Sequence, residues 1–118
     1  MTETKKYDLE DRTLEFAKNV RDFTRSFKKD FANIEDCKQL VRSSGSVGAN
    51  YIEANESLGK KDFLMRIKIS RKEAKESRFW LNLINVNGDT ELARKQRILR
   101  DEATELMNIF GAILRKSQ

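Results

Sequence analysis

The chain has 118 residues, with 24 lysines and arginines against 19 aspartates and glutamates, no histidine, no proline and one cysteine. A chain of this length forms one domain, residues 1–118, with a single core. The lack of proline and a charged fraction of 36%, combined with apolar residues at helical spacing, predict an all-α protein. The lack of histidine removes the commonest general base and metal ligand.

Three further features bear on the compartment. No apolar run approaches the ~18 residues that a membrane span requires, and the first ten residues contain no hydrophobic stretch typical of a signal peptide. A single cysteine forms no internal disulfide, so nothing requires an oxidising environment. We expect a cytoplasmic protein with no membrane partner.

The first expected helix covers about residues 8–28. Residues suited to a core recur every three or four positions, which places them on one face of a helix in a bundle. They are Leu9, Thr13, Phe16, Val20, Phe23 and Phe27. After a short connection, Asn33 is expected to cap the second helix, with Asp36 at the position of a capping-box acid.

The second expected helix, about residues 34–58, is predicted to be the central one. Its core stripe is Cys37, Leu40, Ser44, Val47, Tyr51, Ala54 and Leu58. Between these lie small residues, including Gly45 and Gly48, and each glycine costs a helix interior roughly 1 kcal/mol relative to alanine. Two such glycines predict close approach by another helix. Gly59 is expected to end the helix in a left-handed conformation.

The last two expected helices cover about residues 61–86 and 90–115. The third has its core stripe at Phe63, Ile67, Ser70, Ala74, Ser77, Leu81 and Ile84, and the fourth at Leu92, Leu99, Ala103, Leu106, Phe110 and Ile113. Gly88 is expected to cap the end of the third helix and Asp89 the start of the fourth. Four amphipathic helices with short links predict an antiparallel up-down-up-down four-helix bundle.

The third helix carries apolar residues outside its core stripe: Met65, Ile69, Phe79, Trp80 and Leu83. A helix that is apolar on two sides is either unusually deeply buried or packed against another subunit. A bundle of this size leaves little room for the first arrangement, so the pattern favours a homo-oligomer.

The same helix also carries most of the positive charge. Between Leu58 and Trp80 lie eight basic and three acidic residues. The basic residues Lys61, Lys68, Arg71, Lys75 and Arg78 follow helical spacing, with Lys72 beside them. Such a ridge can follow a phosphate backbone. Composition alone favours a solvated face, with Glu73 and Glu76 forming local ion pairs, whereas repetition of the ridge in a symmetric oligomer would favour binding.

Motifs for catalysis are weak. Ser57 and Lys60 match the Ser-x-x-Lys pattern of acyltransferases, but its companion motifs are absent. No phosphate-binding loop sequence occurs, and Cys37 lies on an apolar stripe, where a small buried side chain is expected. We predict a protein that is not an enzyme and that binds no cofactor and no metal.

Two runs of sequence resemble a known family. Residues 39–54, QLVRSSGSVGANYIEA, and the later Lys61-Asp62-Phe63 with residues 66–76 and Trp80-Leu81 behind them resemble the four-helix-bundle family of S23 proteins, also called 23S rRNA intervening-sequence proteins. The resemblance extends from about Tyr7 to Leu114. Ala54 stands where the family pattern has glycine.

The resemblance implies an antiparallel bundle that assembles into a ring, typically a homopentamer. It also implies a bacterial protein, encoded within intervening sequences of 23S rRNA genes or elsewhere in the genome. Accessory variability proteins of diversity-generating retroelements are related, and are thought to bind nucleic acid through a basic surface. Carried over to this chain, nucleic-acid contacts would be made by Arg42, Lys68, Arg71, Lys72, Lys75 and Arg78.

The leading hypothesis is an oligomeric bundle that binds RNA or another nucleic acid through the basic surface of the third helix. The competing hypothesis is a protein-interaction scaffold whose basic face docks an acidic protein partner.

Overall fold

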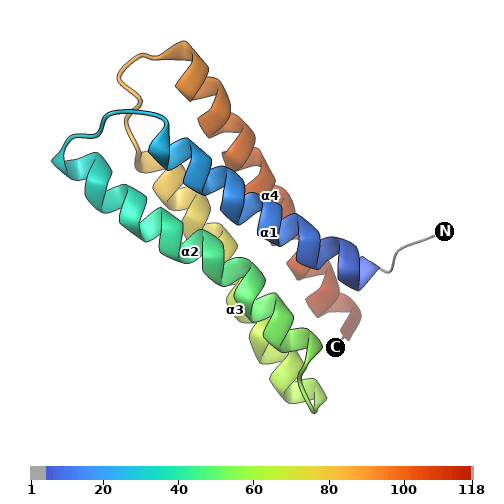
Figure 1. Cartoon of the computed structure of the whole chain (residues 1–118). Coiled ribbons are helices and arrows are strands. Elements are labelled where there is room, and N and C mark those ends of the chain that lie inside the picture. Colours follow the sequence, from blue (N-terminus) through green and yellow to red (C-terminus); the bar gives the residue numbers. More distant parts are fainter. Residues whose placement is uncertain (1–4, 118) are drawn as a thin grey trace.

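The computed structural model describes residues 5–117, with only the backbone described for residues 5–8. Four helices follow one another along the chain: α1 (Lys5–Arg25), α2 (Phe31–Asn55), α3 (Lys60–Leu83) and α4 (Thr90–Ser117). They run alternately up and down, and no strand occurs within residues 5–117 (Figure 1). The predicted all-α four-helix architecture is confirmed.

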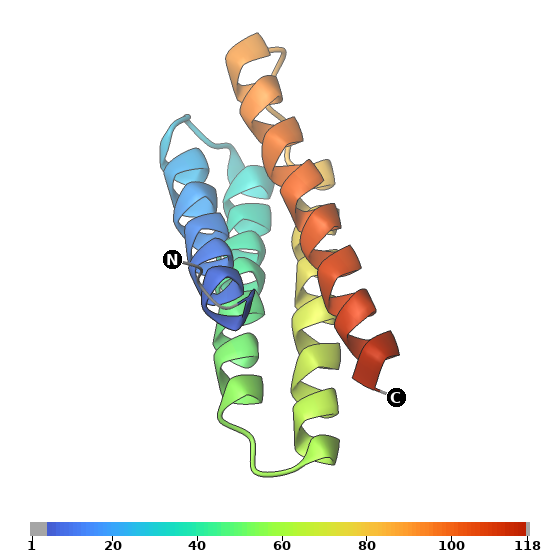
Figure 2. The same cartoon turned by 90° about the vertical axis from the view of Figure 1, so that its right-hand side faces the viewer.

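Helices that are adjacent in sequence pack against each other, and α4 returns to α1 to complete the bundle. The contact between α2 and α3 is the most extensive, and that between α1 and α4 is the smallest. Figure 2 shows α1 and α2 on one side of the molecule and α3 and α4 on the other. Each helix therefore meets its two neighbours along two seams.

The predicted core stripes are buried almost throughout, as the helical spacing requires. Phe27, Phe63 and Ile113 are only partly buried and pack against the edge of the core. The prediction is wrong for Leu58, whose side chain is fully exposed. The physical reason is that α2 ends at Asn55, so Leu58 lies in the link and no longer follows the helical period.

Small residues of α2 lie where other helices approach closely, which confirms the prediction for Gly48 but not for Gly45, where an added Cβ would meet only the end of the Arg21 side chain at 3.5 Å. A Cβ atom on Gly48 would lie 2.8 Å from Oγ1 of Thr13 in α1, which leaves no room for a side chain. On the other side of α2, the hydroxyls of Ser43 and Ser77 are hydrogen-bonded at 2.9 Å. The Ser70 hydroxyl donates to the Val47 carbonyl, also at 2.9 Å. These contacts attach α2 to α1 and α3.

The structure corrects the predicted start of the second helix. Asp30, not Asn33, is the N-cap of α2, and its side chain accepts a hydrogen bond from the Asn33 backbone N–H. Asn33 is buried and serves another purpose: its Nδ2 donates to the Asn85 carbonyl at 2.7 Å, while the Asn85 N–H donates to its Oδ1 at 3.0 Å. This reciprocal pair fixes the start of α2 to the chain that follows α3.

The glycines in the links also differ from expectation. Gly59 has an extended backbone and is the N-cap of α3, whereas Glu56 ends α2. Gly88 lies in the turn with φ of 79°, but α3 has already ended at Leu83. Asp89 does cap α4, because its carboxylate accepts a hydrogen bond from the Leu92 N–H at 3.0 Å.

Candidate nucleic-acid interface

The basic residues predicted on the third helix divide into two groups in the structure. Lys61, Lys68 and Lys72 face outward and line a broad, open hollow together with the apolar side chains of Met65 and Ile69. The sequence placed the basic and apolar residues on different sides of the helix, whereas the structure brings these five together. Part of the outward surface of α3 is therefore both cationic and apolar.

The remaining apolar residues of α3 are exposed to different degrees. Phe79 and Leu83 are 56% and 51% exposed, and Met65 is 47% exposed. Trp80 instead packs partly into the core, with its ring edge against Phe79 at 4.9 Å between centroids. Three large apolar side chains on one face of α3 are thus about half exposed, and Trp80 packs beneath one of them, Phe79.

The second basic group turns towards α4. Arg78 donates from Nη1 to Oγ1 of Thr104 at 3.2 Å. Further along, Arg100 of α4 donates from Nη1 to Oδ1 of Asn82 in α3 at 3.1 Å. From Arg78 to Asn82 the chain advances four residues along α3, and from Thr104 to Arg100 it goes back four residues along α4. This register is the one that antiparallel neighbouring helices require.

Arg71 and Arg115 meet at the other end of the same seam. Both guanidinium groups lie against Gly111 of α4, because a Cβ atom there would be 3.5 Å from Nε of Arg71 and 3.4 Å from Nη1 of Arg115. We call Arg71, Arg78, Arg100 and Arg115 the seam arginines. Lys75, which is exposed, falls between Arg71 and Arg78 on α3.

The seam arginines have no acidic partner among the described side chains. The ion pairs within residues 9–117 involve Arg12, Arg25, Lys38, Arg42 and Arg94. None of the seam arginines is among them. The charge of this seam is therefore left uncompensated within the described chain.

Sequence reasoning missed Arg100 and Arg115. They lie on a different helix from the ridge, and no local spacing connects them with it. The predicted antiparallel arrangement could have indicated Arg100, because it places the start of α4 beside the end of α3.

Arg42, the remaining predicted contact, lies apart from the seam arginines. It projects from α2 beside Glu76 of α3, with 3.9 Å between Nη2 and the carboxylate. Close by, Glu73 is buried, and its Oε1 has no hydrogen-bond partner in the part of the chain that the structure describes. Burial raises the pKa of Glu73, the nearby Glu76 raises it further, and Arg42 and Lys72 act in the opposite direction. The α2–α3 seam is thus of mixed charge.

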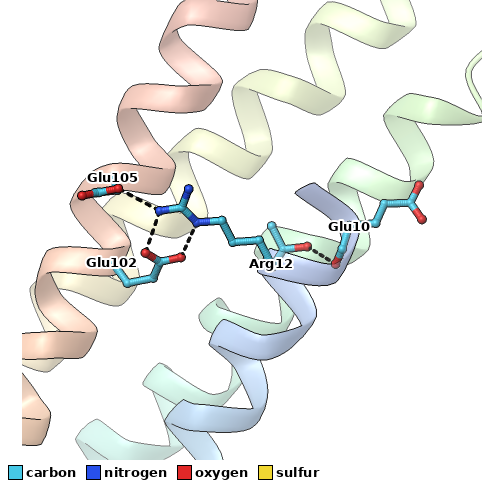
Figure 3. Close-up of polar contacts among 5 residues, drawn as sticks. Glu10, Arg12, Glu102 and Glu105 are labelled. Atoms are coloured by element: carbon cyan, nitrogen blue, oxygen red, sulfur yellow. Dashed lines mark hydrogen bonds and ion pairs between the residues drawn. The ribbon is translucent and has the colours of Figure 1, made fainter. Parts of the chain in front are cut away.

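The α1–α4 seam is acidic, with one cation at its centre. The Arg12 guanidinium binds Glu102 through two hydrogen bonds of 2.7 and 2.8 Å, and Glu105 through a third of 2.8 Å (Figure 3). These hydrogen bonds raise the pKa of Arg12. Asp11, Glu15 and Asp101 line the surface around the ion pairs.

Other kinds of site receive little support from the geometry. Within the described chain, no cluster of three or more acidic or cysteine side chains is arranged to hold a metal ion. None of the helices between residues 5 and 117 combines the length and hydrophobicity that crossing a bilayer requires. Cys37 is buried, and burial raises the pKa of its thiol.

The fold and this surface define a class: a small antiparallel four-helix bundle with one cationic seam. Residues 5–112 match the family described as 23S rRNA-intervening sequence protein, and the chain belongs to that family. A similar solved structure is the crystal structure of a protein of unknown function from the S23 ribosomal protein family of Bacteroides thetaiotaomicron. It is 27% identical, with a TM-score of 0.81 over 95% of this chain and 99% of that chain. The comparison with curated proteins gives no match.

Proposed function

We propose that this protein is not an enzyme and that it binds RNA through the basic surface of α3, extended by the arginines of α4. The observation that carries the proposal is the set of seam arginines without an acidic partner within residues 9–117. Unpaired cations attract phosphates and release the counterions condensed around a nucleic acid, which favours binding.

The arrangement of the donors suits a phosphate backbone better than base edges. The seam follows two straight helices, and α3 rises 1.5 Å per residue, so Arg71 and Arg78 are about 10 Å apart along the axis. Contacts of this kind determine affinity and orientation but carry little sequence information. We therefore expect binding with weak sequence preference. Ribosomal RNA is the first ligand to test, because the family description links it to 23S rRNA.

The test is a fluorescence anisotropy titration of a labelled ribosomal-RNA hairpin, at salt concentrations from 50 to about 200 mM. A Lys68→Glu/Arg71→Glu/Lys75→Glu variant should lose most of its affinity. The slope of log K against log salt should fall by about 0.7–0.9 for each phosphate contact removed.

A matched control changes the net charge equally at another place. Lys18→Glu/Arg25→Glu/Lys28→Glu reverses three exposed cations on and after α1, and this variant should keep the larger part of its affinity. Equal losses of RNA affinity in both variants would show that net charge alone attracts the RNA. If the wild type does not bind the RNA at 50 mM salt, the proposal is rejected.

A protein-interaction scaffold is the second candidate. The observation that favours it is the hollow on α3, where Met65 and Ile69 lie among Lys61, Lys68 and Lys72. An acidic, amphipathic partner helix would bury the apolar pair and neutralise the lysines. Binding of such a partner that Met65→Ser/Ile69→Ser abolishes, with no RNA binding by the wild type, would favour this candidate.

Self-association is part of the proposed function. Met65, Phe79 and Leu83 form an exposed apolar face on α3, and burying it between copies would repeat the cationic surface around the assembly. Several weak phosphate contacts on one assembly then act together and increase the apparent affinity. The resemblance described above implies that the assembly is a pentamer.

A further inference from the structure

We infer that Arg71 and Arg115 form a discrete site for one phosphate group over Gly111. This site rests on the proposed function for its natural ligand, a phosphodiester of the bound RNA. It differs from a general cationic surface because it requires two guanidinium groups in a fixed relation to each other. It also assigns a role to α4 in binding, which the basic pattern of α3 alone did not predict.

The first step is the convergence of two like charges. Nε of Arg71 and Nη1 of Arg115 both lie within 3.5 Å of the point where a Gly111 Cβ would stand. Neither guanidinium group makes a hydrogen bond or ion pair within residues 9–117. Two guanidinium groups placed together without an acceptor repel each other. An anion between them would remove that repulsion and accept hydrogen bonds from both.

The second step concerns the glycine. In α2, Gly48 is explained by packing, because Thr13 of α1 leaves no room for a Cβ. At Gly111, apart from its two chain neighbours and its own helix backbone, the described atoms within 4 Å of an added Cβ belong to the two arginine side chains. Glycine lowers the stability of a helix relative to alanine, and close helix packing does not require it here. A Cβ at this position would touch both guanidinium groups at ordinary van der Waals distance, so the two arginines lie directly over the α4 backbone and the proposed site does not depend on the glycine.

The third step is the chemistry of the ligand. A guanidinium donates two parallel N–H groups, which match two oxygens of a phosphate. Two arginines at one point can therefore hold the two non-bridging oxygens of a phosphodiester. Arg78 lies on the same seam, about 10 Å from Arg71 along α3. This arrangement suits a ligand with several phosphates, such as a nucleic-acid backbone, better than an isolated anion. A carboxylate of an acidic protein is the competing ligand class.

The experiment follows the arginine Nε–Hε signals by NMR in the ¹⁵N-labelled full chain during titration with inorganic phosphate. The Arg71 and Arg115 signals should move together, with one dissociation constant in the millimolar range. Arg25, an exposed arginine on α1 that is weakly paired with Asp22, is the internal control and should move little. Equal shifts at all three arginines would overturn the site.

Two variants separate the site from its surroundings. Arg71→Lys/Arg115→Lys keeps the charge but loses the planar fork, so phosphate affinity should fall at least tenfold while the salt dependence of RNA binding is retained. Gly111→Ala, whose added Cβ has room beside both guanidinium groups, should keep the phosphate affinity within about twofold and should not lower the melting temperature, whereas the comparison variant Gly48→Ala should lower it. Unchanged phosphate affinity in Arg71→Lys/Arg115→Lys would overturn the site.

The outcomes also distinguish the site from the proposed function. RNA binding that is unaffected by Arg71→Lys/Arg115→Lys leaves the function standing and rejects the site. Phosphate shifts confined to Arg71 and Arg115, with no RNA binding, reject the function and keep the site. A hexaglutamate peptide that displaces phosphate with equal or higher affinity would reject the phosphate class of ligand.

Discussion

The two sides of α4 differ in whether their charged side chains are paired with opposite charges. Towards α1, Glu102 and Glu105 surround Arg12 and are neutralised by it within the chain. Towards α3, Arg100 donates to Asn82 and Arg115 lies near Arg71, and neither Arg100 nor Arg115 belongs to an ion pair within residues 9–117. Charges that hold helices together are paired inside the molecule. Charges that remain unpaired are available to a ligand, and this contrast separates the structural seam from the candidate interface.

The size of the two contacts supports the same distinction. α1 and α4 share the smallest helix–helix contact of the bundle, whereas α3 and α4 pack along much of their length. The weakly packed seam has an ion-pair network, in which one guanidinium serves two carboxylates. The well-packed seam does not need one, because buried apolar residues such as Leu81 and Leu106 already stabilise it.

The largest expected effect is a difference in RNA affinity between substitutions in the α3–α4 seam and substitutions in the α1–α4 seam. Arg78→Glu/Arg100→Glu should weaken binding of the ribosomal-RNA hairpin at least about tenfold at 50 mM salt and reduce the salt slope by about 1.4–1.8. Glu102→Gln/Glu105→Gln, on the other side of the same helix, should leave the affinity within about twofold. Anisotropy titrations check both, and equal effects of the two pairs would remove the distinction between the seams.

The next effect concerns the apolar face that lies beside the cationic surface. Phe79→Glu places a charge where Met65, Phe79 and Leu83 are expected to be buried between copies, so the assembly should dissociate to monomers of 13.8 kDa. Sedimentation or light scattering gives the mass. Ile98→Glu, a change at an equally exposed residue on α4, is the control. An unchanged mass for Phe79→Glu would place the interface elsewhere.

A smaller effect concerns stability: removing an arginine from each of the two seams should change the free energy of unfolding in opposite directions. Arg12→Met removes a cation that bridges two helices, so the free energy of unfolding should fall by about 0.5–1 kcal/mol, and less in high salt. Arg71→Gln removes a cation that faces another cation, so the free energy of unfolding should rise by about 0.3 kcal/mol. Urea unfolding measures both. A loss in both variants would mean that the α3–α4 arginines are also structural.

The smallest effect is a pH dependence from the α2–α3 seam. Burial, with Glu76, raises the pKa of Glu73 above its ordinary value of 4.5. Between 4.5 and the raised pKa the folded state holds a proton that the unfolded state has lost, so stability should increase as the pH falls through this window. Glu73→Gln should remove this dependence and raise the melting temperature at pH 7 by a few degrees. A wild-type melting temperature that falls steadily from pH 7 to 5 while the variant keeps the same slope would contradict it.

The fold could be predicted because its information is local. The three- and four-residue spacing of residues such as Phe16, Leu40 and Leu106 indicates one buried face on each helix. Gly48 could be recognised because a glycine inside a helix has a measurable cost. The helix ends could not be placed as well. Asn33 has the chemistry of a cap, yet its amide bonds to Asn85, a residue 52 positions away that no local pattern connects with it.

The candidate site divides in the same way. The sequence by itself determined four amphipathic helices and the basic and apolar residues of α3, because charge and periodicity are properties of short segments. Only the tertiary structure decided that Arg71 meets Arg115 at Gly111, that Arg78 and Arg100 continue the same line, and that Arg12 neutralises Glu102 and Glu105. These neighbours come from different helices, and their pairing depends on which faces meet and in which register, which the packing of the whole bundle sets.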